Sequence, residues 1–396
     1  MKALRYLVIG ILMPVLAGVI AFGMDNARLM RSPDINGDKI VFVYGGDLWT
    51  VGSNGGNAVR LTSFAGTESQ PKFSPDGKWI AFSGDYDGNT DVYIIPSTGG
   101  EPKRLTWHPG ADVVDGWTSD GKSIIFYSRR DSFSRYAQIY TISVNGSFPE
   151  LLPFPMGTFA SFSADGKHIA YTPLVNAFTT WRRYRGGLTN YIWIYNKSDN
   201  SVKKIPHPNC TDTYPVWIGD EIYFLSDRDR VMNLYSFNTK KDEVKQITKF
   251  EGADIKSYGA DKNKIVFERE GYLNLMDIKS GKIEKLTVNI PNEGIILRPH
   301  FTKAGRLIQN FNISPSGQRA VFEARGEIST VPAKKGDIRN ITNTTSAAER
   351  TPAWSPDGKW IAYFGEVDGE YALEISDQMG AEKPKVIKLK IGRAHV

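Results

Sequence analysis

The residues KFSPDGKWIAF, from Lys72 to Phe82, decide the fold of this chain. Their Asp76–Gly77 pair predicts a tight turn, because glycine tolerates the positive φ that such turns need. The apolar run Trp79–Phe82 then predicts a mostly buried strand. A near-copy, WSPDGKWIAY, begins at Trp354, and weaker copies begin at Trp117, Phe162 and Ile313. A hairpin that recurs in this way predicts a repeat architecture.

Each repeat contains the elements of four short strands. In the opening repeat the second strand is followed by a polar loop, a third strand at 91–95 and an outer strand at 103–106. These elements keep their order from one repeat to the next, at intervals of about 45 residues. Four short strands per unit is the composition of one propeller blade.

The repeats predict an all-β fold with two parts. Residues 33–309 form a six-bladed β-propeller, and residues 310–390 form the truncated start of a second β-propeller. The fourth and sixth units carry insertions, at 178–187 and 290–306. A seventh unit and part of an eighth would need further chain to bury their faces, so we expect the natural protein to continue. Residues 391–396, IGRAHV, break the repeat pattern in mid-blade, and we expect them to be a non-native tail. The six units are expected to begin near Ser32, Pro71, Trp117, Ser161, Val216 and Tyr258.

Residues 1–23 have the order of a secretory signal peptide. Lys2 and Arg5 precede an apolar run, and small residues follow it. The alternative is an uncleaved membrane anchor over residues 6–24. Both interpretations predict an exported protein, periplasmic or extracellular, which contacts a membrane only through this segment.

Composition and motifs exclude several functions. The 49 Lys and Arg residues are scattered along the chain, whereas nucleic-acid binding requires them to cluster. Cys210 is the only cysteine, so no disulfide can form within the chain, and we expect a buried thiol. No nucleophile motif accompanies the histidines, so we expect no catalytic residue and no cofactor. Asp85, Asp87, Asn89 and Asp91 alternate as in a calcium loop, but the glycine and closing glutamate are misplaced; we favour turn chemistry and predict no metal site.

Several stretches resemble the tricorn-type serine peptidases. These are LMRSPDI from Leu29, GDLW from Gly46, WRRYRGG from Trp181 and ARGE from Ala324. The repeats themselves are also similar to those of TolB, and the resemblance covers residues 28–390. Membership of the tricorn family would imply a larger homo-oligomeric protein. Its propellers would guide peptides to a serine-peptidase module that this chain lacks.

Two groups of arginines are candidate anchors for a peptide carboxylate. They are suggested by the resemblance, because paired arginines of the first tricorn propeller bind the substrate's terminus. Guanidinium groups also match carboxylates in geometry. The structural alternative is a solvated or interface loop. The candidates are Arg129, Arg130, Arg182, Arg183 and Arg185.

The sequence thus favours one function and leaves two alternatives. The favoured function is substrate guiding in an exported tricorn-like serine peptidase, with peptides or unfolded protein segments as partners. The first alternative is a non-enzymatic TolB-like propeller that binds envelope proteins. The second is the propeller of a prolyl-oligopeptidase-like enzyme.

Overall fold

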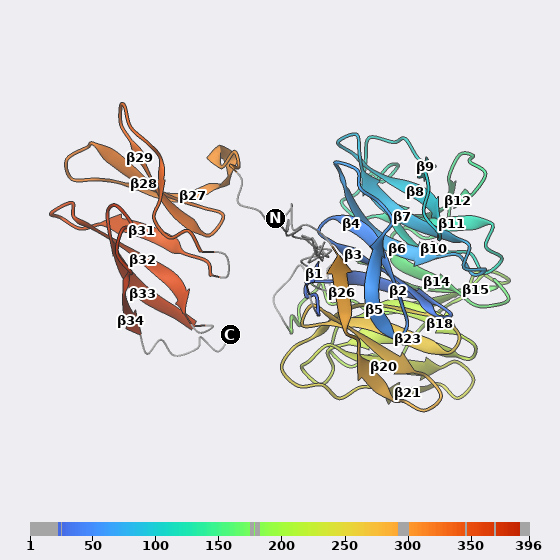
Figure 1. Ribbon diagram of the computed structural model, residues 1–396. Helices are drawn as coiled ribbons and strands as arrows, with labels where there is room; N and C mark the ends of the chain where they lie inside the picture. Colours follow the sequence, from blue (N-terminus) through green and yellow to red (C-terminus); the bar gives the residue numbers. More distant parts are fainter. Residues whose placement is uncertain are drawn as a thin grey trace, which may run out of the picture. The chain divides into compact units, whose positions relative to one another are not determined.

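The computed structural model describes residues 23–24, 26–174, 178, 183–291, 301–344, 347–367 and 370–388. The chain divides into two compact units, Met1–Ile296 and Leu297–Val396, and each is described by itself (Figure 1). No helix in the described part of the chain is both long enough and apolar enough to cross a membrane. Residues 1–22 of the signal segment, Arg182 and the tail at 391–396 lie outside the described residues.

The described residues of the first unit form six sheets, each with four consecutive antiparallel strands. The first three sheets contain β2 (Arg31–Asn36), β3 (Lys39–Tyr44), β4 (Asp47–Gly52) and β5 (Gly55–Arg60); β6 (Thr67–Phe73), β7 (Trp79–Asp85), β8 (Thr90–Pro96) and β9 (Lys103–Arg104); and β10 (Asp112–Trp117), β11 (Ser123–Ser128), β12 (Gln138–Ser143) and β13 (Glu150–Leu151). The next three contain β14 (Thr158–Phe162), β15 (His168–Thr172), β16 (Trp193–Asn196) and β17 (Val202–Lys204); β18 (Asp212–Ile218), β19 (Glu221–Ser226), β20 (Asn233–Asn238) and β21 (Glu243–Gln246); and β22 (Ile255–Ala260), β23 (Lys264–Arg269), β24 (Tyr272–Asp277) and β25 (Ile283–Lys285).

The first strands of the six sheets pack against one another in a ring. β2 contacts β6, and the series continues through β10, β14 and β18 to β22, which returns to β2. The second strands are buried on both faces, as Ile124, Ile125 and Phe126 of β11 show. The arrangement is that of propeller blades around a central channel.

The opening stretch forms the hairpin between β6 and β7, as predicted. Ser74 Oγ donates to Asp76 Oδ1 at 2.6 Å and accepts from the amide of Trp79 at 3.0 Å. Gly77 has φ +70°. Ile80 and Phe82 are fully buried, but Trp79 is 40% exposed, because it stands at the first position of the strand.

The first strands begin three to five residues before most of the predicted blade starts, for example at Asp112 instead of Trp117. Most of the predicted starts lie at or near the aromatic residue beside each turn, whereas the strands extend further back through a β-bulge. Four of these strands hold a non-glycine residue at positive φ beside the bulge. These are Ser32, Gln70, Phe159 and Tyr214.

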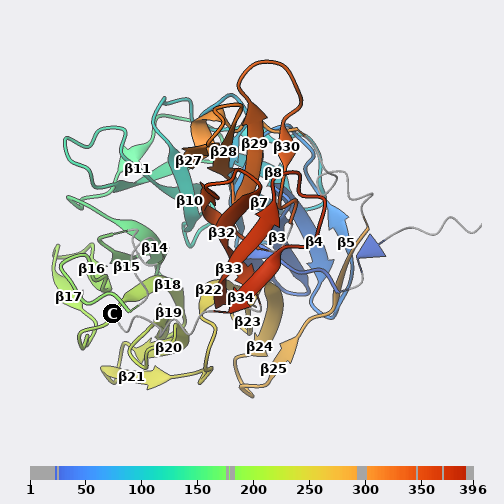
Figure 2. The same cartoon turned by 90° about the vertical axis from the view of Figure 1, so that its left-hand side faces the viewer.

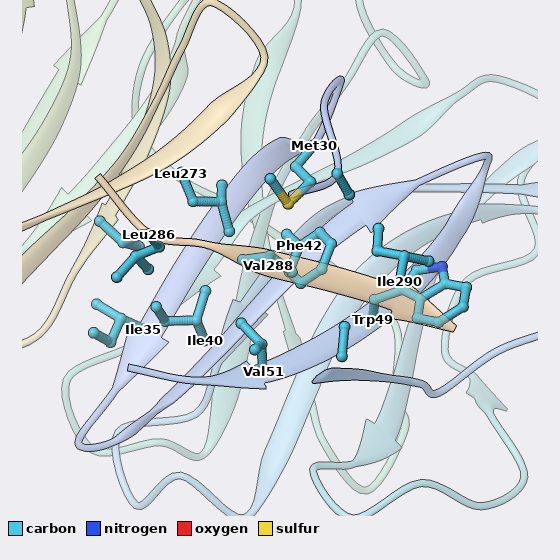
Figure 3. Close-up of a cluster of buried hydrophobic side chains, with 13 residues drawn as sticks. Met30, Ile35, Ile40, Phe42, Trp49, Val51, Leu273, Leu286, Val288 and Ile290 are labelled. Carbon is cyan, nitrogen blue, oxygen red and sulfur yellow. The ribbon is translucent and has the colours of Figure 1, made fainter. Parts of the chain in front are cut away.

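A further strand joins the two ends of the ring. β26 (Val288–Pro291) runs parallel to β5 of the first sheet, and β1 (Gly23–Met24) pairs with β26. The sequence analysis had placed Ile290 in an insertion of the sixth unit, and this was wrong. Val288 and Ile290 are fully buried against the first and sixth sheets, in a cluster with Phe42 and Leu273 (Figure 3). Burial of each such side chain contributes roughly 1.5–3 kcal/mol.

The second unit contains two more four-stranded antiparallel sheets (Figure 2). They are preceded by a 3-10 helix, η3 (Gly305–Leu307). Unlike β2 or β6, the first strand β27 is exposed along its whole length. The strands are β27 (Ile308–Ile313), β28 (Arg319–Ala324), β29 (Glu327–Pro332) and β30 (Arg339–Asn340), then β31 (Arg350–Trp354), β32 (Trp360–Val367), β33 (Glu370–Asp377) and β34 (Lys385–Lys388).

Candidate substrate-binding site

A channel runs between the first strands of the six sheets. Where these strands end, it widens into a cavity of about 670 Å³, which is in the size range of ligand pockets. A narrower space of about 30 Å³ lies further in, beside Asp115 and Tyr214, and can hold a water molecule. Every sheet contributes to the wide end, through Asn36, Pro75, Ser119, Ala164, Gly219 and Lys262.

Asp34, Lys72 and Asp115 are among the charged residues that line this channel. Lys72 Nζ lies 3.8 Å from Asp34 Oδ1, and Asp34 Oδ2 accepts from the amide of Phe73 at 2.7 Å. Burial raises the pKa of Asp34 to about 6, although Lys72 acts in the opposite direction. Asp115 Oδ2 accepts from the amide of Ala160 at 3.2 Å, while its Oδ1 has no hydrogen-bond partner among the described residues. Burial raises the pKa of Asp115 to about 8, so its carboxyl is mostly protonated at neutral pH.

Arg130, the second arginine of the first candidate pair, already has a carboxylate partner. It forms an ion pair with Asp112, and the two side chains are 10% and 0% exposed. Its guanidinium carbon lies 5.3 Å from the ring centroid of Phe126 and 5.6 Å from that of Tyr140. A peptide carboxylate would have to displace Asp112.

The same arrangement recurs two blades further on. Arg228 pairs with Asp212 at 2.7 Å, and the two side chains are 14% and 0% exposed. The Arg228 guanidinium lies over Phe224 and Tyr235. A contact set that repeats between blades is best explained as part of the blade's structure.

The second group of candidates lies in the insertion of the fourth blade. Arg185 binds Asp227 at 2.7 Å and so attaches the insertion to the fifth blade. Arg183 has φ +62°, and its Nε donates to the carbonyl oxygen of Arg230 at 2.9 Å. Because Arg182 lies outside the described residues, the structure places only two members of this group.

Arg129 differs from the other candidates, because its side chain is exposed and makes no ion pair or hydrogen bond with the described residues. It borders a pocket of about 710 Å³ between the third and fourth blades, at the opposite end of the sheets from the wide cavity. Tyr127, Leu174 and Leu188 give this pocket apolar walls, and Arg135 adds a second cation. An apolar pocket with a few polar groups is the usual form of a ligand site.

The acidic loop at 85–91 is held by an arginine. Arg104 contacts Asp87 at 2.8 Å and Asp91 at 2.5 Å. Asn89 Nδ2 also donates to Asp91, at 2.9 Å. These bonds explain the alternating acidic residues by local structure.

The sequence analysis missed one cluster of possible metal ligands among the histidines and the cysteine. His108 Nδ1 accepts from the amide of Gly110, and His168 packs on Trp217. Cys210 is buried as expected, and burial raises the pKa of its thiol to about 12. His207, Cys210 and Asp212 lie together, although no metal ligands were predicted. The spacing His-x-x-Cys-x-Asp was the available signal.

The six sheets and the channel between them define a six-bladed β-propeller, and comparison with known proteins identifies the family. A profile of the tricorn protease N-terminal β-propeller domain matches residues 27–282. The chain therefore belongs to this family. This result favours the first of the functional hypotheses drawn from the sequence.

Individual relatives agree with this assignment. The chain is 27% identical over 359 residues to a tricorn protease homolog of Saccharolobus solfataricus, covering 89% of this chain and 32% of that protein. It is 29% identical to the tricorn protease of Thermoplasma acidophilum, covering 77% and 29%. The crystal structure of the tricorn protease matches 91% of this chain and 44% of its own, with a TM-score of 0.58 and 22% identity, and so shares the fold. The chain spans about a third of the length of these curated relatives.

Proposed function

We propose that this chain is the substrate-guiding N-terminal part of a tricorn-type serine peptidase. It would bind and direct peptides, and a module outside this chain would cleave them. The observation that carries the proposal is a channel lined by all six blades in a member of the tricorn propeller family.

The second unit is proposed to begin a second propeller. Phe311 and Ile313 of β27 are 66% and 63% exposed, whereas the first strands of propeller blades normally line a packed ring. Further blades would cover them. A structure of the full-length protein in which β27 stays exposed to solvent would overturn this assignment.

We also propose that the full-length protein is exported and forms a homo-oligomer. The basic and apolar order of residues 1–23 supports export. Amino-terminal sequencing of the mature protein tests it, because a start near residue 24 indicates a cleaved signal and an intact start in a soluble cell fraction argues against export. Light scattering of the full-length protein tests assembly, and a monomer would contradict it.

Arg129 is the proposed anchor for the carboxylate of a bound peptide. Its guanidinium is exposed at the rim of the pocket between the third and fourth blades, and the apolar walls would hold the peptide's last side chains. Arg130 would contribute indirectly, by fixing the loop through Asp112.

Peptide binding by this chain tests the proposal. Fluorescence anisotropy would compare apolar peptides with a free carboxylate and the same peptides with a terminal amide. We expect Arg129→Ala to weaken binding of the free acid about tenfold or more, since a hydrogen bond to a charged group is worth about 1.5–3 kcal/mol. Binding of the amide should hardly change.

Arg183→Ala is the matched control, because Arg183 is also exposed but is not part of this pocket. It should leave both affinities unchanged. Equal binding of acid and amide by the unmodified chain would rule out a carboxylate anchor.

A further inference from the structure

One group of side chains at the start of the fifth blade does not line the channel or the pocket beside Arg129. A ring nitrogen of His207, Sγ of Cys210 and a carboxylate oxygen of Asp212 lie within 4.8 Å of one another. Cys210 and Asp212 are fully buried, and His207 is partly buried. We propose that these three residues bind a divalent transition-metal ion of the zinc type.

The donor set is appropriate for Zn²⁺, which prefers histidine nitrogen, thiolate sulfur and carboxylate oxygen in tetrahedral geometry. With bonds of about 2.0–2.3 Å, tetrahedral ligands lie roughly 3.5 Å apart. Cys210 Sγ and Asp212 Oδ1 are already 3.4 Å apart. A small movement of His207 would complete the set, and solvent would supply the fourth ligand.

A backbone carbonyl fixes the tautomer of His207 that metal binding requires. His207 Nε2 lies 3.1 Å from the carbonyl oxygen of Asn190. A carbonyl oxygen only accepts, so Nε2 carries the proton and the neutral ring keeps a lone pair on Nδ1. Metal-binding histidines commonly donate their second ring N–H in this way.

Arg228 binds one oxygen of the Asp212 carboxylate and leaves the other available to a metal ion. It binds Asp212 Oδ2 at 2.7 Å, which leaves Oδ1 directed toward Cys210. The positive charge of Arg228 opposes a second cation, but the thiolate formed on binding compensates for it. The balance is simple: the metal–sulfur bond replaces the S–H bond, and the thiol proton leaves to solvent.

The third blade shows that the ion pair does not require the histidine or the cysteine. Asp112 and Arg130 form the same pair there, while Trp107 and Gly110 occupy the positions that match His207 and Cys210. The fifth blade therefore adds two metal-binding side chains to an ion pair that exists without them. The metal would tie the loop before β18 to the end of the fourth blade.

Cobalt substitution tests the site in the whole 396-residue chain. After treatment with a chelator, we expect one equivalent of Co²⁺ to give the near-ultraviolet absorption of a cobalt–thiolate bond, and Zn²⁺ to abolish it. Zn²⁺ should also raise the Tm, because binding to the folded state stabilises that state.

Cys210→Ser should remove the thiolate absorption, and His207→Asn should weaken Co²⁺ binding by at least about tenfold. His168→Gln is the control, since His168 lies elsewhere and packs on Trp217; it should bind as the unmodified chain does. The proposal is overturned if the folded, unmodified chain shows no thiolate absorption with Co²⁺. It is equally overturned if Cys210→Ser retains the absorption.

Discussion

Asp115 lies at the neck of the channel, where burial raises the pKa of its carboxyl from 3.8 to about 8. Between about pH 4 and pH 8 the folded state therefore keeps the proton of Asp115, whereas the unfolded chain has released it. The contribution of Asp115 to the free energy of unfolding is fully present below pH 4 and is lost as the pH rises toward 8. The slope is at most about 1.4 kcal/mol per pH unit.

Asp115→Asn should remove this dependence, because an amide does not titrate. Urea unfolding at pH 5, 6 and 7 should show the variant gaining stability relative to the unmodified chain as the pH rises. Asp120→Asn is the control. Asp120 is exposed, and hydrogen bonds from the Thr118 hydroxyl and the Lys122 amide lower its pKa, so the effect of this substitution should be constant over this range. A constant difference for Asp115→Asn as well would show that its carboxyl is ionised in the fold.

Among the structural elements, the recurrent turns join the first two strands of each blade. Gly77 and Gly121 occupy the same place in successive turns, with φ +70° and +68°. A side chain at such angles costs about 1 kcal/mol or more. A Cβ on Gly77 would also lie 2.7 Å from Asn36 Oδ1, whereas one on Gly121 meets only Pro75 at 3.4 Å.

Gly77→Ala should therefore cost more than Gly121→Ala. Asn36 Nδ2 donates to the carbonyl of Ser74 at 3.2 Å and so links the first two blades. Displacing it would add up to about 1 kcal/mol to the loss seen for Gly121→Ala. Urea midpoints of the two variants make the comparison, and equal losses would mean that the Asn36 bridge contributes nothing.

The hairpins were predictable from the sequence because their information is local: a turn pair, an apolar run and a constant order. The β-bulges were not, because residues such as Gln70 and Tyr214 take positive φ only under constraint from the neighbouring strand. The site shows the same division. Arg129 and Arg130 are adjacent in sequence, yet Asp112 pairs with one and leaves the other exposed.

At the scale of the molecule, a propeller must hold its last blade to its first. The described ring is joined by β26, which follows the sixth sheet and pairs with β5 of the first. The repeat pattern could not reveal this strand, because Val288–Pro291 resembles no part of a repeat. Its contribution depends on contacts between residues more than 230 positions apart in sequence, such as Ile290 and Phe42.

Ile290→Ala tests this closure. Ile290 is fully buried between the first and sixth sheets, so the substitution should cost about 2–5 kcal/mol of unfolding free energy. Thr287→Ala is the control on the same segment, because Thr287 is exposed and its hydrogen bond with the amide of Gly56 uses only the backbone carbonyl. In Ile290→Ala, hydrogen exchange should rise in β2–β5 and β22–β26 before it rises in β10–β13, because the ring should open first where β26 joins its ends. Faster exchange spread evenly over the six sheets would show that β26 stabilises the unit without acting as its closure.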